Sequence, residues 1–286
     1  MKIGVIGTIC YDKIILYSGE EVESFGGTLY NVVALANLTP HEIYPISWIG
    51  KDKIEELHTL LKDYPTVKED GLELTEKTTK HTLIYTSLTQ RKEFPSKGLR
   101  EISFSMIEPF LNVDFLLINF IHPFDLSVET LFQIRASFKG PIFMDIHAYA
   151  HHHVVHDFSP ISYADILQAN EFEATVLYGK KLSNYKEIGL SLIRKGPSIV
   201  LLTLGEEGAV VCYDKKCEFT MAEKINVKDV TGAGDTFSAG FISNYIETKD
   251  PIRATKFAHR VAAICCETTG LDGLQLLKQV SDKTKS

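Results

Sequence analysis

Long apolar stretches are missing from this 286-residue sequence, and none of its runs is long enough to predict a membrane-spanning helix. Positive charge is also in short supply, because 30 Lys and Arg residues stand against 37 Asp and Glu, a net charge of −7. This balance argues against general nucleic-acid binding, although it permits a small phosphorylated ligand. Repeats, low-complexity tracts and flexible linkers are absent, so we expect one domain over residues 1–286.

Cysteine is scarce, and the five residues are Cys10, Cys212, Cys217, Cys265 and Cys266. An odd number without regular spacing is not typical of a secreted disulfide framework. Cys212 and Cys217 flank a predicted hairpin turn and could lie opposite each other, but free thiols are the favoured interpretation. The N-terminal MKIGVIGTICYD resembles a short strand rather than a signal peptide, so we expect a cytoplasmic protein.

Short apolar strands alternating with longer helical patterns dominate the remaining sequence. The strand-like runs are continuously apolar, as in a parallel sheet covered on both faces: KIGVIG, DFLLINF, PIFMDI, ADILQAN and SIVLLTLG. Helical spacing occurs in residues 126–138, 184–195, 235–247, 252–266 and 273–280. This alternation predicts an α/β fold, with a doubly wound, mostly parallel sheet flanked by helices.

Two more polar segments interrupt this pattern, at about residues 12–25 and 72–104. They include the alternating stretches HTLIYTSLT and KGLREISFS, which favour antiparallel strands. We expect them to form a small β lid over the open edge of the main sheet.

The stretch DVTGAGDTF, residues 229–237, joins a glycine turn to the start of a helix. Gly232 and Gly234 allow successive N–H groups to converge, and the helix N-terminus favours an anion at the same point. Asp235 would repel that anion unless it accepts a proton from an attacking hydroxyl. The alternative is a simple helix-capping aspartate, and the local stretch alone supports both interpretations equally.

Other polar or glycine-rich motifs follow predicted strands, where open α/β sheets bind ligands. They are GTICYD with Asp12, GGTLYN with Gly26, Gly27 and Asn31, NEFE with Asn170 and Glu173, and TLGEEG with Thr203, Gly205 and Gly208. The spacing of Asn170 and Glu173 predicts that both point to one helix face. Each motif is weak evidence by itself.

Together these motifs resemble the PfkB, or ribokinase-like, family of carbohydrate kinases. Two signatures, GGTLYN and DVTGAGDTFSAGF, occur in order, and the similarity extends over nearly the whole chain. The resemblance implies an ATP-dependent kinase that transfers the γ-phosphate to a sugar hydroxyl, with Mg²⁺ as cofactor. A homodimer formed through the lid is also implied, with no nucleic-acid or membrane partner.

The resemblance assigns a role to each matching residue. Asp235 would be the general base, and the N–H groups of Gly232, Ala233 and Gly234 would form an anion hole. Sugar-binding positions would be Asp12, Gly26, Gly27 and Asn31. ATP-binding positions would be Asn170, Thr203, Gly205, Gly208 and His259, with Glu173 holding Mg²⁺ through water. For His259, a core-facing histidine is an equally weighted alternative. A monovalent cation, K⁺, would use Asp229 and Thr231, with carbonyls near Cys265, Thr268 and Gly270.

Some features differ from ribokinase or leave alternatives open. Thr28 stands where ribokinase has a lysine, and IHPFDL stands where ribokinase has a sugar-binding glutamate, which puts plain ribose in doubt. The basic residues Arg91, Lys92, Lys97 and Arg100 could receive a phosphorylated or acidic sugar, but a solvated loop is favoured. The histidine tract of residues 147–156 could bind zinc or nickel, but incidental metal affinity is favoured.

Two further functions remain as alternatives at this stage. One is a nucleoside kinase of the same superfamily, in which Tyr85 and Phe94 would be candidates to line a wider acceptor pocket. The other is a catalytically silent sugar-binding or regulatory protein, against which the predicted base, anion turn and Asn170–Glu173 pair argue.

Overall fold

A nine-stranded sheet forms the centre of the computed structural model, which describes residues 1–95, 99–122, 125–148, 159–178 and 184–283. Its strand order is β13-β12-β11-β10-β9-β8-β1-β4-β5. The strands are β1 (Lys2–Ile6), β4 (Glu42–Gly50), β5 (Leu72–Thr75), β8 (Phe115–His122), β9 (Ile142–Ala148), β10 (Ile166–Asn170), β11 (Ile199–Thr203), β12 (Gly208–Tyr213) and β13 (Lys216–Met221). Pairing is parallel from β5 to β11, and β12 and β13 extend one edge antiparallel. The predicted mostly parallel α/β sheet is confirmed.

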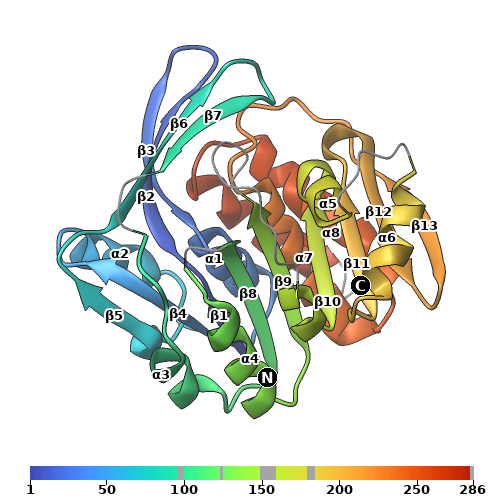
Figure 1. Ribbon diagram of the computed structural model, residues 1–286. Helices are drawn as coiled ribbons and strands as arrows, with labels where there is room; N and C mark the ends of the chain where they lie inside the picture. Colours follow the sequence, from blue (N-terminus) through green and yellow to red (C-terminus); the bar gives the residue numbers. More distant parts are fainter. Residues whose placement is uncertain (96–98, 123–124, 149–158, 179–183, 284–286) are drawn as a thin grey trace.

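Helices cover both faces of this sheet (Figure 1). One face packs against α1 (Leu29–Leu38), α2 (Ile54–Leu61), α7 (Ala233–Thr248), α8 (Pro251–Cys266) and α9 (Leu277–Lys283). The other packs against α3 (Phe104–Ile107), α4 (Val128–Ser137), α5 (Glu171–Tyr178) and α6 (Tyr185–Ile193). Short 3₁₀ turns complete the connections, at Glu69–Gly71, Glu108–Phe110, Ser159–Tyr163, Gly205–Glu207 and Asp272–Leu276. None of the described helices combines the length and the apolarity that a membrane crossing requires.

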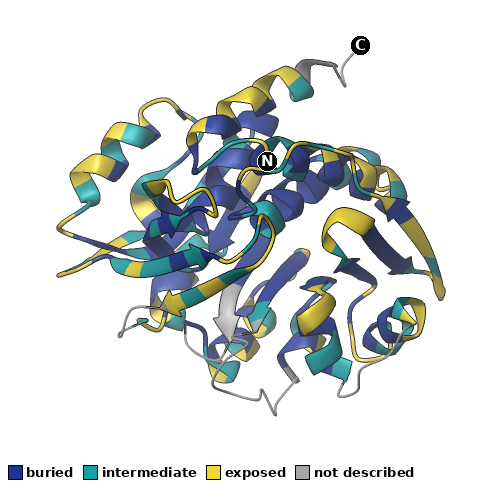
Figure 2. Ribbon diagram, turned by 90° about the horizontal axis from the view of Figure 1, so that it is seen from above, coloured by how far each residue is buried: buried dark blue, intermediate teal, exposed yellow. Residues whose placement is uncertain are grey.

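Alternation along the central strands creates two hydrophobic cores, because successive side chains point to opposite faces. Leu117 of β8 and Phe143 of β9 belong to the core beneath α7 and α8. Leu116 and Met144, their neighbours in sequence, belong to the core beneath α4 and α6. Both faces of these strands are buried, which explains why the strands are mostly apolar, with polar residues such as Asn119 and Asp145 as exceptions (Figure 2).

The predicted helices all occur, with small changes at their ends. The pattern at 273–280 divides into a 3₁₀ turn, Asp272–Leu276, followed by α9. Helix α7 begins two residues before its predicted start, directly after Gly232. The carboxylate of Asp235 therefore lies in the first turn of the helix.

A separate four-stranded sheet, ordered β3-β2-β6-β7, extends from the upper left of the molecule in Figure 1. Its strands are β2 (Ile9–Ile15), β3 (Glu21–Gly27), β6 (Thr79–Tyr85) and β7 (Arg91–Pro95). The expected purely antiparallel arrangement is wrong, because β6 pairs parallel with β2. Strand β5 is also not part of this sheet, since it extends the large sheet beside β4. Residues 99–103, expected as a strand, have no regular structure and lead into α3.

The hairpin between β12 and β13 corrects the expectation of free thiols. Cys212 and Cys217 are register partners in this hairpin and form a disulfide. The turn places Asp214 and Lys215 at positive φ, the geometry of a tight two-residue hairpin loop. That loop brings the two thiols directly opposite each other. Cys10, Cys265 and Cys266 are buried free cysteines, as expected.

Candidate active site

The glycine turn before α7 has the conformation that its sequence predicts. Gly232 has φ +77°, and a Cβ there would lie 2.2 Å from Cδ1 of Tyr30, so only glycine fits. The N–H of Ala233 donates to the carbonyl of Val230 at 3.2 Å. This hydrogen bond engages one of the three N–H groups that were predicted to form the anion hole. The N–H groups of Gly232 and Gly234 have no acceptor among the described residues. These two groups therefore remain available for an anion at the start of α7.

Two asparagines hold Asp235 from neighbouring elements. Nδ2 of Asn119, in the middle of β8, donates to Oδ1 of Asp235, and it donates to Oδ1 of Asn31 at 2.7 Å. Nδ2 of Asn31, on α1, donates in turn to the backbone carbonyl of Asp235 at 2.8 Å. Sequence analysis selected Asn31 but missed Asn119, whose only signal was a polar residue in an apolar strand.

Asp145 and His147, both on β9, approach the same carboxylate. Nε2 of His147 lies 3.6 Å from Oδ1 of Asp235. Burial raises the pKa of Asp145 to about 6, although hydrogen bonds from Ser238 and Gln168 act in the opposite direction. Burial alone would lower the pKa of His147, but Asp145 and Asp235 outweigh it and raise that pKa well above the usual value. The rest of the predicted histidine tract lies outside the described residues, apart from Ala148.

Asn170 and Glu173 form a reciprocal cap at the start of α5. The N–H of Asn170 donates to Oε2 of Glu173 at 2.7 Å, and the N–H of Glu173 donates to Oδ1 of Asn170 at 2.9 Å. Asn170 is the last residue of β10, so the expectation that both lie on one helix face is wrong. The second carboxylate oxygen of Glu173 lies 3.8 Å from Nδ1 of His147. Glu173 thus joins the carboxylates of Asp145 and Asp235 around His147, and carboxylate oxygens are the ligands that Mg²⁺ with its waters prefers.

Asp12 lies on β2, and its carboxylate occupies the space above Gly26 of β3, the register partner of Cys10. A Cβ on Gly26 would lie 1.9 Å from Oδ2 of Asp12, and one on Gly27, at φ +61°, would lie 2.2 Å from the carbonyl oxygen of Thr8. The glycines are therefore required by the space that Asp12 and the β2 backbone occupy. Burial raises the pKa of Asp12 to about 7, and nearby Arg91 partly offsets that rise.

The small sheet contacts the loop before the glycine turn through Tyr85. Its hydroxyl donates to Oδ1 of Asp229 at 2.6 Å and accepts from the N–H of Val230 at 3.2 Å. Arg91 donates to Oγ1 of Thr231 at 3.4 Å. The other carboxylate oxygen of Asp229 is buried and has no hydrogen-bond partner among the residues that the structure describes. The monovalent-cation site at Asp229 and Thr231 stays a prediction. Sequence analysis missed both lid contacts.

The other basic residues near the small sheet do not gather with Arg91. Lys92 is exposed, Lys97 lies outside the described residues, and the guanidinium of Arg100 lies 5.2 Å from the ring centre of Trp48. In the IHPFDL stretch, Asp125 accepts from the hydroxyl of Thr8 at 2.9 Å.

The predicted nucleotide turn follows β11, whose last residue, Thr203, is the register partner of Asn170. Gly205, at φ +58°, is exposed, whereas a Cβ on Gly208 would lie 2.0 Å from the carbonyl oxygen of Thr220. The turn therefore starts beside the Asn170–Glu173 cap, and Gly208 allows β12 to pass close to β13.

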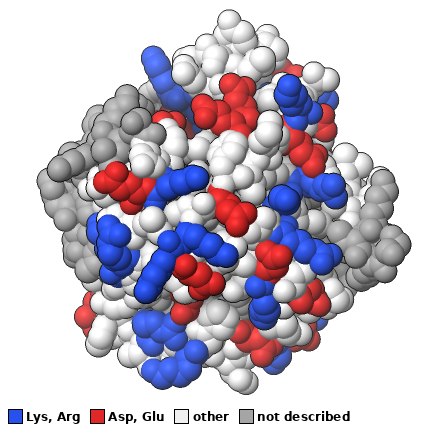
Figure 3. Space-filling model, turned by 90° about the vertical axis from the view of Figure 1, so that its right-hand side faces the viewer, with Lys and Arg blue, Asp and Glu red and all other residues white. Residues whose placement is uncertain are grey.

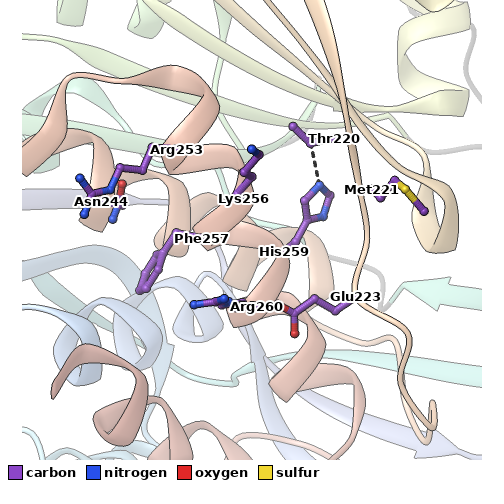
Figure 4. Close-up of a pocket in the computed structure, with 9 residues that line it drawn as sticks. All are labelled: Thr220, Met221, Glu223, Asn244, Arg253, Lys256, Phe257, His259 and Arg260. Atoms are coloured by element: carbon purple, nitrogen blue, oxygen red, sulfur yellow. Dashed lines mark hydrogen bonds and ion pairs between the residues drawn. The ribbon is translucent and has the colours of Figure 1, made fainter. Parts of the chain in front are cut away.

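His259, on α8, is buried, and its Nε2 lies 2.9 Å from Oγ1 of Thr220 (Figure 4). The ring meets Phe237 edge to face at 5.3 Å between centroids. His259 also borders a cavity of about 450 Å³ between α8 and the end of β13, together with Thr220, Met221, Glu223, Asn244, Arg253, Lys256, Phe257 and Arg260. On the face of the molecule that Figure 3 shows, basic and acidic side chains intermingle.

Comparisons with known proteins identify the family and the fold of this chain. The model of the pfkB family of carbohydrate kinases matches residues 2–276. A ribokinase from Staphylococcus aureus is 30% identical over 126 residues, which cover 42% of this chain and 41% of that enzyme. The aligned part thus spans less than half of that relative.

Solved structures with a similar fold cover the whole chain. Ribokinase from Thermotoga maritima superposes with a TM-score of 0.79 at 20% identity, covering 98% of this chain and 99% of its own. Aminoimidazole riboside kinase from Salmonella enterica superposes with a TM-score of 0.78 at 19% identity, over the full length of both chains. At these identities the similarity establishes the fold alone.

Proposed function

The chain belongs to the pfkB family of carbohydrate kinases, and we propose that it transfers the γ-phosphate of ATP to a hydroxyl group of a sugar. The observation that carries the proposal is the position of Asp235 in the first turn of α7. Its carboxylate is held by Asn119, next to the free N–H groups of Gly232 and Gly234. A proton acceptor and an anion site therefore adjoin each other, as transfer to a hydroxyl requires.

In the proposed reaction, Asp235 accepts the proton of the acceptor hydroxyl as its oxygen attacks the γ-phosphorus. The bond to the bridging oxygen of ATP breaks, and ADP leaves with the electron pair. The N–H groups of Gly232 and Gly234 stabilise charge on the transferred group. Bound Mg²⁺, held through water by Glu173, would neutralise phosphate charge. Asn119 keeps the carboxylate of Asp235 in place and restricts its rotation.

Asp12 is the proposed anchor of the sugar, because its carboxylate is buried and lies against Gly26, which has no side chain to block a ligand. The nucleotide would occupy the side of Asn170, Thr203 and Gly205, with His259 farther along α8. Potassium at Asp229 and Thr231, dimerisation through the small sheet and a cytoplasmic location remain predictions from the sequence.

Asp235→Asn tests the base assignment. We expect kcat to fall by at least about a hundredfold, while the affinity for ATP changes little, because the amide keeps the shape but cannot accept the proton. Asp63→Asn, at an exposed position, is the matched control. A near-normal kcat in Asp235→Asn would overturn the assignment.

A nucleoside acceptor is the second candidate. The fold shared with aminoimidazole riboside kinase keeps it open, but the hydroxyl of Tyr85 is engaged by Asp229 and the side chain of Phe94 is half exposed. Turnover on a panel of sugars and nucleosides separates the two classes. Ligand binding without turnover on any of them would favour the catalytically silent alternative.

A further inference from the structure

Two polar side chains with unpaired buried atoms lie next to each other on the small sheet. Asp12 and His81 are register partners on β2 and β6, and Nδ1 of His81 lies 3.9 Å from Oδ1 of Asp12. Oδ1 of Asp12 and Nε2 of His81 are both buried, and neither has a hydrogen-bond partner among the described residues. Leaving a buried polar atom unpaired is costly, so one such atom on each of two adjacent side chains indicates a ligand that pairs with them.

The chemistry of the pair matches adjacent hydroxyl groups. Burial lowers the pKa of His81, although Glu93 acts in the opposite direction, so the neutral ring offers one donor and one acceptor nitrogen. A carboxylate accepts hydrogen bonds, and a hydroxyl both donates and accepts. One hydroxyl can therefore donate to Asp12 while its neighbour pairs with the imidazole.

The surrounding charges disfavour an anionic acceptor. Arg91 is the nearby cation, but its guanidinium already pairs with Glu93, with Nη2 2.7 Å from Oε1. The negative charges of Glu93 and Asp235 both raise the pKa of Asp12, so they act on this site. Among the described residues the other nearby cation, His147, is matched by the carboxylates of Asp145 and Asp235, so a sugar phosphate or acidic sugar would meet an excess of negative charge.

A metal is the other ligand to weigh, because Cys10, Asp12 and His81 hold potential ligand atoms within 4.8 Å of one another. Burial, followed by the charge of Asp12, raises the pKa of the Cys10 thiol well above its ordinary value. Metals bind the thiolate, which this environment suppresses. The three residues therefore fit a neutral polyol better than a transition metal.

We propose that His81 is a specificity-determining residue that binds, together with Asp12, two adjacent hydroxyls of an uncharged sugar or polyol. The inference rests on the proposed function, whose acceptor it narrows to molecules with a vicinal diol besides the hydroxyl that is phosphorylated. His81 lies on β6 of the small sheet and belongs to neither of the two family signatures, GGTLYN and DVTGAGDTFSAGF.

The experiment compares His81→Phe, which keeps the ring shape without its nitrogens, with His81→Asn, which restores a donor and an acceptor. Thr82→Val, on the opposite face of β6, is the matched control. Steady-state kinetics with the best sugar should give His81→Phe about a tenfold higher KM for sugar, with kcat within about threefold and the KM for ATP unchanged. His81→Asn should recover part of the loss, and Thr82→Val should resemble wild type.

Deoxy analogues of the sugar identify the bonded hydroxyl. An analogue that lacks it should bind wild type and His81→Phe equally, whereas analogues altered elsewhere should keep the difference. An unchanged KM in His81→Phe, an equal loss with every analogue, or a stoichiometric transition metal that His81→Phe removes would each overturn the inference. If wild type phosphorylates no sugar, the proposed function fails, and calorimetric sugar binding by the same variants still tests His81.

Discussion

Replacing Asp12 by asparagine should stabilise the ligand-free protein in neutral and alkaline solution, although it removes the proposed sugar anchor. Burial raises the pKa of Asp12 from 3.8 to about 7. A folded-state pKa above the unfolded value means that stability is greatest below the unfolded pKa and is lost as pH rises through the folded one. Roughly three pKa units correspond to a penalty of about 4 kcal/mol above pH 7. Asparagine carries no charge and avoids this penalty.

Urea unfolding of both proteins without ligand, at pH 5, 6, 7 and 8, measures the effect. The free energy of unfolding of Asp12→Asn minus that of wild type should increase by about 2.5 kcal/mol from pH 5 to pH 8. The change with pH is the diagnostic quantity, because any packing cost of the amide is the same at each pH. A difference that stays constant from pH 5 to pH 8 would refute the argument that burial of this carboxylate dominates its energy.

Two further predictions concern the loop before α7. Gly232→Ala places a side chain at φ +77° and against the ring of Tyr30, so the free energy of unfolding should fall by at least about 2 kcal/mol and kcat should decrease strongly. Denaturant unfolding and steady-state kinetics measure the two effects, and a variant as stable as wild type would contradict the clash. Tyr85→Phe removes the hydroxyl bonded to Asp229 and should cost about 1–3 kcal/mol in unfolding free energy, measured in the same way; no loss would mean that the hydrogen bond contributes little.

The secondary structure was largely predictable because its signals are local. Continuous apolar runs marked β1 and β8 to β11, and helical spacing marked α4 and α6 to α8. Prediction failed where pairing with a distant strand decides the outcome. The sequence of β5 alternates like a lid strand, yet it pairs with β4, and β6 runs parallel to β2 rather than antiparallel.

The disulfide is a second feature that depends on strand pairing and was not predicted from the sequence. The loop between Cys212 and Cys217 predicted a hairpin, and the structure has one. General arguments from cysteine number and expected compartment favoured thiols, whereas the register of that hairpin brings the two sulfur atoms together. Register depends on how whole strands pair, so composition carried little information about this bond.

The sequence by itself determined the glycine turn and the place of Asp235 in the helix that follows it, because their geometry depends on contiguous residues. Only the tertiary structure decided what surrounds that carboxylate. Asn119 is 116 residues from Asp235 along the chain, and His147 reaches it from a third element. Likewise, Asp12 meets His81 only because β2 and β6 pair in one register. Local patterns specify elements, whereas the partners of a buried polar atom depend on how those elements pack.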